Sequence, residues 1–74
     1  MDWNKEAAYV IKAVKSRYGV EWKDIVKLLK DDLDFELSSR AIANRVSNGA
    51  FSFVLALQIL AVLKVKEIDI PEVK

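Results

Sequence analysis

Residues 39–52 read Ser39-Arg40-Ala41-Ile42-Ala43-Asn44-Arg45-Val46-Ser47-Asn48-Gly49-Ala50-Phe51-Ser52. Ser39 is a favourable helix N-cap, and Asn48-Gly49 is a typical helix stop, because glycine adopts a left-handed backbone at little cost. Ser52 is a second N-cap directly downstream. The stretch therefore predicts a short helix over about 40–47, a tight turn and another helix from residue 53. The inward positions of the short helix are Ile42, Ala43 and Val46.

Helical spacing of apolar residues extends outward from this stretch. It predicts helices over about 3–18 and 21–30, the first capped by Asp2 and stopped by Gly19. A last helix over about 53–63 is apolar nearly all round, with Gln58 as its single polar residue. We therefore expect one small, mainly α-helical domain over residues 1–74, with four or five helices. The aromatic residues expected to anchor its core are Trp3, Trp22, Phe51 and Phe53.

Residues 31–37 follow a different pattern. Leu33, Phe35 and Leu37 alternate with acidic and polar residues, which is typical of a short strand or an extended loop with one buried face. Residues 67–70 alternate in the same way before Pro71. We expect a short two-stranded pairing of 33–37 with 67–70, or a pairing of the tail with its own copy across a dimer axis.

The composition argues against catalysis, metal binding and membrane insertion. The chain has no His and no Cys, so it lacks the commonest general base and the usual zinc ligands. The acidic run 31–36 has no mid-loop glycine of the kind that calcium loops need. The apolar stretch 50–63 is shorter than the ~20 residues of a membrane span. We expect no enzyme activity, cofactor, metal or small-molecule substrate, and a polar N-terminus without a secretory signal favours a cytoplasmic location.

The capped helix, its Asn48-Gly49 stop and the N-cap Ser52 resemble the recognition helix and following turn of Cro and phage-repressor-type helix-turn-helix domains. The entry Gly19-Val20-Glu21-Trp22-Lys23-Asp24-Ile25 is similar to the start of that family's first motif helix. The pattern Ile42-x-Asn44-Arg45-Val46-x-x-Gly49-x-Phe51-Ser52 is also similar to a small bacterial domain family of unknown function. The resemblance covers roughly residues 19–65. It implies a repressor-type fold and binding of duplex DNA by a dimeric transcriptional regulator.

The resemblance also implies which residues contact DNA. With the glycine stop as anchor, base-reading positions fall on Arg40, Ala41, Asn44 and Arg45, and a phosphate contact falls on Asn48. Arginine grips guanine bidentately, and asparagine does the same with adenine. The exposed face predicted for Lys23, Lys27 and Lys30 adds contacts to the DNA backbone.

The charge distribution limits this interpretation. Residues 1–30 hold seven basic and four acidic side chains, residues 31–37 hold four acidic ones, and residues 38–49 hold only Arg40 and Arg45. A basic surface therefore requires the acidic segment to fold away from the short helix. Two alternatives stay open: Arg45 pairs with Asp34 or Glu36, or Asn44 hydrogen-bonds to the acidic segment.

A domain this small cannot bury every side of a helix that is apolar all round. We therefore expect a homodimer, and its interface residues are predicted to be Leu57, Leu60, Leu63, Ile68 and Ile70. The alternative function is a protein-interaction module on the same scaffold without DNA binding, in which the surplus apolar surface docks a partner chain.

Overall fold

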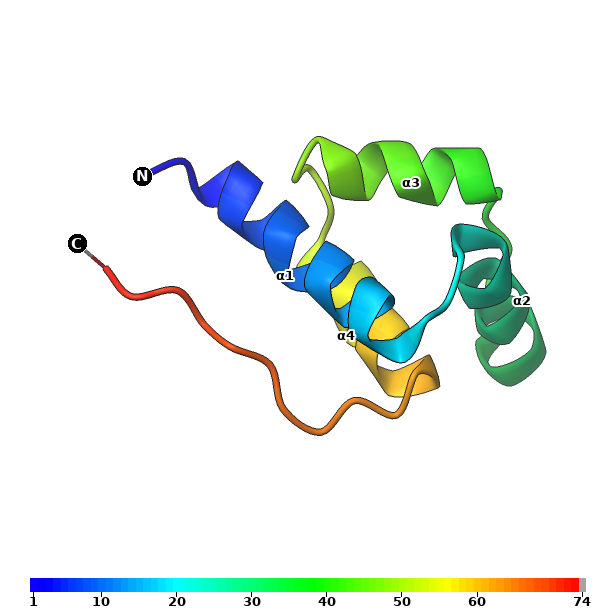
Figure 1. The fold of residues 1–74 in the computed structure, drawn as a ribbon. Helices are drawn as coiled ribbons and strands as arrows, with labels where there is room; N and C mark the ends of the chain where they lie inside the picture. The colour runs from blue at the N-terminus through cyan, green and yellow to red at the C-terminus, as the bar shows by residue number, and fades with distance from the viewer. Residues whose placement is uncertain (74) are drawn as a thin grey trace.

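The computed structural model describes residues 1–73. It contains four helices: α1 (Trp3–Tyr18), α2 (Trp22–Leu33), α3 (Ser39–Ser47) and α4 (Phe53–Val62). Figure 1 shows α3 along one edge of the molecule, α1 beside α4, and the tail after α4 running along the opposite edge. Within residues 1–73 there is no β-strand. The mainly α-helical architecture is thus confirmed, with four helices in the described chain.

Side-chain caps start three of the four helices. Asp2 Oδ1 accepts hydrogen bonds from the Asn4 and Lys5 amides at 3.0 and 3.3 Å. Ser52 Oγ accepts from the Leu55 amide at 3.0 Å. The cap of α3 is Ser38, whose Oγ accepts from the Ala41 amide at 3.1 Å, so the helix begins one residue earlier than the sequence predicted.

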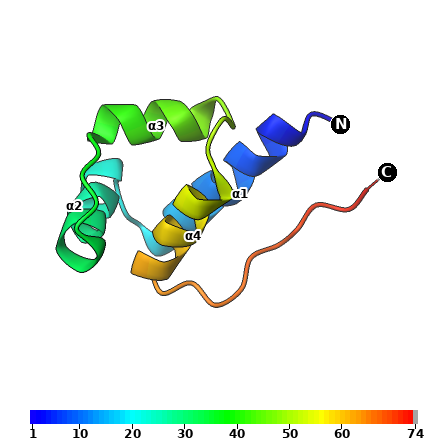
Figure 2. The same cartoon turned by 180° about the vertical axis from the view of Figure 1, so that it is seen from behind.

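The predicted pairing of residues 33–37 with 67–70 is wrong. Helix α2 continues to Leu33 and ends at Asp34, whose φ is +52° and whose amide donates to the Lys30 carbonyl. The amide of Phe35 then donates to the Leu29 carbonyl at 3.1 Å, which closes the helix end and leaves no straight strand there. The tail lies on another side of the molecule (Figures 1 and 2). An isolated pair of short strands is only marginally stable in water, so its hydrogen bonds would not compensate for those lost at the end of α2.

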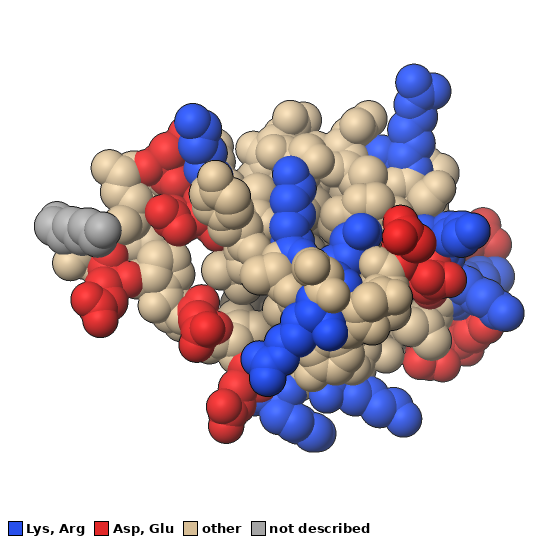
Figure 3. All heavy atoms as spheres, viewed as in Figure 1, with Lys and Arg blue, Asp and Glu red and all other residues tan. Residues whose placement is uncertain are grey.

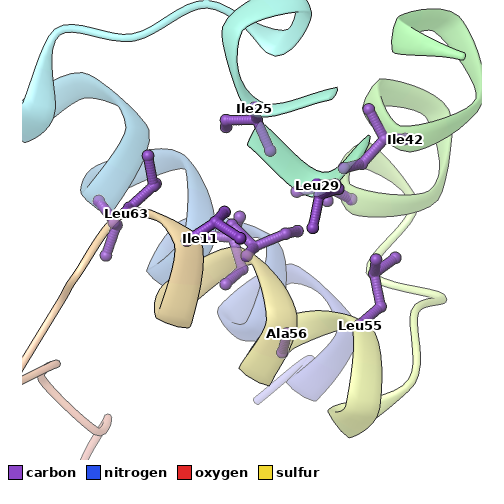
Figure 4. Packing of buried hydrophobic residues seen from close by; sticks show 11 residues of the cluster. Ile11, Ile25, Leu29, Ile42, Leu55, Ala56 and Leu63 are labelled. Carbon is purple, nitrogen blue, oxygen red and sulfur yellow. The ribbon is translucent and has the colours of Figure 1, made fainter. Parts of the chain in front are cut away.

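The core is built where α2, α3 and α4 meet. Five side chains are fully buried there: Ile25, Leu29, Ile42, Val46 and Ile59. Figure 4 shows the two α2 residues and Ile42 pointing into one space, with Ile11 of α1 entering the same cluster. Helix α3 has only nine residues, so its stability depends on burying its apolar face in this cluster.

The turn between α3 and α4 touches the start of α1 at Gly49. Its φ is +66°, and a Cβ added there would lie 2.0 Å from the backbone oxygen of Asn4. Gly19, at the end of α1, has a similar φ of +64°, but a Cβ there would meet nothing within 4 Å. Of these two glycines, only Gly49 combines a left-handed backbone with a close approach to another segment.

We therefore predict that Gly49→Ala destabilises the fold more than Gly19→Ala does. The left-handed backbone alone costs alanine about 1–2 kcal/mol at either position. At Gly49 the clash with Asn4 adds to it, for a total of about 3 kcal/mol or more. Urea unfolding followed by circular dichroism measures both free energies of unfolding, and equal losses at the two glycines would contradict the close approach.

Candidate nucleic-acid interface

The segment that joins α2 to α3, residues 34–38, runs back along α2 (Figures 1 and 2). A shallow hollow beside it is lined by Val26 and Lys30 of α2 and by Glu36, Leu37 and Ser38 of the segment. As a result, α3 begins beside the first turn of α2. A second shallow hollow lies between these two helix starts, lined by Glu21, Trp22, Lys23, Ser39 and Arg40.

The face of α3 opposite the core carries polar residues at helical spacing. Arg40, Asn44 and Asn48 follow one another at intervals of four, and all three are exposed. Arg45 is also exposed beside this stripe, while Ala41 is half-buried. Helix α3 contains no acidic residue. These are the five residues of this region that the sequence predicted as DNA contacts, and the fold brings them together on one side of α3.

Neither alternative for Arg45 and Asn44 is found among the described contacts. Within residues 1–73, Arg45 forms no ion pair, and the Asn44 side chain forms no hydrogen bond to the acidic segment. The acidic segment pairs with Lys30 instead: its Nζ lies 3.1 Å from Asp34 Oδ1 and 2.6 Å from Glu36 Oε1. These contacts, with Glu36 first, raise the pKa of Lys30 above its ordinary value of 10.5.

The acidic residues at the end of α2 lie away from the start of α3. Asp31 and Asp32 are in the last turn of a helix of twelve residues, which spans about 18 Å. The α3 start faces the other end of that helix. In Figure 3 a basic side chain projects from the α3 edge without acidic atoms beside it, whereas basic and acidic atoms mix over α2.

The lysines predicted on α2 have unequal surroundings. Lys23 and Lys27 are exposed and form no ion pair with any described residue, while Lys30 is occupied by two carboxylates. The first turn of α2 also holds acid groups. Glu21 Oε2 lies 3.9 Å from Lys15 Nζ, and Asp24 Oδ2 accepts a hydrogen bond from the Glu21 amide at 2.9 Å. Anion binding at this helix start therefore depends on lysine side chains more than on free backbone amides.

The residues predicted for a dimer interface separate into two groups. Four of them remain accessible to a partner. Leu57 and Ile70 are 49% and 72% exposed, Ile68 is also exposed, and Leu60 is half-buried. Leu63 is 8% exposed and belongs to the core, so it is not available to a partner in this conformation. The prediction that Trp3 and Phe53 lie in the core is wrong, because their side chains are 52% and 75% exposed.

Other kinds of site are not visible in the described part of the chain. No group of three or more His, Cys, Asp or Glu side chains among residues 1–73 is placed to hold a metal ion. Among the described helices, none has the length and hydropathy needed to cross a bilayer.

Comparison with known proteins shows the family. A family model described as a domain of unknown function (DUF6471) matches residues 3–68, which is most of the 74-residue chain. The chain therefore belongs to this family. No curated protein and no solved structure matches the chain significantly.

Lys30 pairs with both Asp34 and Glu36, so we expect it to hold residues 34–38 against α2. In Lys30→Met we expect faster hydrogen exchange at the Phe35 amide, because this amide closes the helix end beside the lost ion pairs. Lys27→Met is the matched control, since Lys27 is exposed and pairs with no described residue. Equal exchange rates in the two variants would contradict the role of Lys30.

The same contact predicts a pH dependence. The pKa of Lys30 is higher in the folded chain than in the unfolded chain. The ion pairs of Lys30 therefore stabilise the fold fully at pH values below the unfolded pKa, and this stabilisation is lost as pH rises through the folded pKa. We expect carbon-detected NMR to show the Glu36 carboxyl carbon shifting in the alkaline range above pH 10.5 in the parent chain. That shift is expected to be absent in Lys30→Met, and a shift that persists there would assign it to another group.

Proposed function

We propose that this member of the DUF6471 family is a helix-turn-helix-like domain that binds duplex DNA and acts in transcriptional regulation. The observation that carries the proposal is the exposed stripe Arg40, Asn44 and Asn48 on a helix without acidic residues. In this proposal α3 is the recognition helix. Arg45 and Ala41 flank the stripe and complete the contact surface.

The chemistry of the stripe supports this assignment. The major groove of DNA admits an α-helix, and arginine and asparagine are side chains that read guanine and adenine there. Arg40 lies at the start of α3, the end that repressor-type domains direct toward base edges. Asn48 caps the other end of the helix, where an exposed amide can donate to a phosphate oxygen.

The surrounding charges support backbone contacts of modest strength. Lys23 lines the hollow beside Arg40, and Lys27 follows one turn later on α2. Both are unpaired among the described residues, as are Arg40 and Arg45. Glu21 lies in the same hollow and opposes phosphate binding. We therefore expect affinity to fall as salt concentration rises, with a slope set by about four cationic contacts.

The second candidate function is protein docking without DNA, and the exposed apolar residues of α4 favour it. Salt separates the two functions, because counterion release makes phosphate binding weaken steeply with salt while apolar docking changes little.

The test is a binding titration of the chain with a pool of random-sequence duplexes, followed by fluorescence anisotropy on the selected sequence. We expect Arg40→Ala to cost about 1–3 kcal/mol and to relax the preference at one base pair. Lys27→Ala is expected to weaken all duplexes alike and to lower the salt slope by about 1. Lys66→Ala is the matched control, because Lys66 is an exposed lysine of the tail, and the tail runs along the edge opposite α3 (Figure 1).

Two results would refute DNA binding through α3. One is the absence of salt-sensitive binding to any duplex at low ionic strength. The other is that the Arg40→Ala and Arg45→Ala variants bind the selected duplex as tightly as the Lys66→Ala control does.

A further inference from the structure

An open apolar groove lies between α1, α4 and the tail. Its walls are formed by the first half of α1, the start of α4 and the tail residues Ile68, Ile70 and Pro71, and its volume is about 310 Å³. Trp3 and Phe53 line it while remaining half or more exposed. Glu6 is the one charged residue among its lining. The groove therefore offers apolar surface that the described chain does not cover.

The apolar surface continues from the groove over the outer side of α4. Phe53 belongs to both surfaces, and Val54 and Leu57 extend it at helical spacing with exposures of 63% and 49%. The patch thus contains a hollow and projecting side chains next to each other. A twofold interface needs this combination, because the same patch must fit itself.

We propose that this patch, made of the α1–α4 groove, Phe53, Val54, Leu57 and Ile70, is the surface through which two copies of the chain form a twofold dimer. In that dimer the projecting Phe53 ring of each copy enters the groove of the other.

The chain leaves enough surface uncovered for a dimer interface. It exposes 5389 Å², whereas a compact monomer of 8.4 kDa is expected to expose about 4,600 Å². The excess of about 800 Å², taken over the whole chain, equals the area that each partner contributes to an interface of standard size. The extended tail and the open groove beside it contribute to this excess.

The charges favour self-association over docking of a charged partner. Side chains near a twofold axis lie close to their own copies, so like charges there would repel each other. The acidic residues of the tail, Glu67 and Asp69, line a separate hollow on the other side of the tail together with Arg17. Hence they do not face each other across the groove.

The position of the patch leaves the α3 surface free. Figures 1 and 2 both show α3 along one edge of the molecule and the tail along the opposite edge. Two copies joined through the groove therefore keep the start of each α3, where Arg40 lies, accessible. The dimer does not depend on the proposed function, since its argument uses only apolar area, shape and charge.

Sedimentation equilibrium of the chain over a wide concentration range tests the dimer. We expect a reversible monomer–dimer equilibrium up to twice 8.4 kDa that persists at high salt. Phe53→Glu is expected to weaken it about tenfold or more, because two carboxylates would meet near the axis. The substitution preserves the fold, since a glutamate in the first turn of α4 interacts favourably with the helix dipole.

A second variant and a control separate the patch from general effects. Ile70→Glu, in the tail wall of the groove, is expected to weaken the dimer in the same direction. Tyr9→Glu replaces a ring that is 67% exposed on α1 but outside the groove lining, and should leave the dimer intact. Circular dichroism checks that each variant keeps its helices.

A chain that stays monomeric at every concentration would overturn the proposal. A dimer that resists both Phe53→Glu and Ile70→Glu would do so as well, because its interface would lie elsewhere. DNA binding is measured separately on a duplex with one recognition site, so loss of that binding in a chain that still dimerises contradicts only the proposed function.

Discussion

The apolar contact between α2 and α3 determines where the polar face of α3 can point. Ile42 and Val46 are fully buried against a cluster that includes Ile25 and Leu29. Residues on the opposite side of α3 are then exposed by geometry, since in a helix of 3.6 residues per turn residues four positions apart share a face and residues two positions apart lie on opposite faces. A nine-residue helix has little stability of its own, so the orientation of Arg40, Asn44 and Asn48 is a consequence of this packing.

Capping residues explain why the helices were predictable from the sequence. Asp2, Gly19 and Ser52 act locally, through hydrogen bonds or backbone conformation within a few residues, and the structure places each where the sequence predicted. The end of α2 was less predictable, because the helix continues through Leu33 into a segment whose apolar residues alternate, and it ends only where Asp34 takes a left-handed conformation. There the alternation reflects two side chains, Phe35 and Leu37, that pack onto the core from a returning segment.

The exposed face of α4 could not be predicted, for a different reason. When nearly every position of a helix is apolar, the sequence has no polar face to mark the side that meets solvent. The structure buries Leu55, Ile59 and Val62 and exposes Phe53 at 75%. Leu63, expected at an interface, completes the core instead. The outward positions of α3 were easier to predict, because polar and apolar residues repeat there with a clear helical period.

Near-neutral net charge conceals a division of the surface into regions with different character. Lys30 holds two of the carboxylates that follow it, so the acidic segment beside α2 is partly neutralised where it approaches the start of α3. The α3 stripe carries cationic and amide groups, and the groove between α1, α4 and the tail is lined by a single charged residue. Polar recognition and apolar burial make opposite demands on solvent, because desolvating an unpaired charge is costly whereas desolvating apolar surface is favourable. Because α3 and the tail run along opposite edges of the molecule (Figure 1), the polar stripe and the tail wall of the groove meet these opposite demands on separate surfaces.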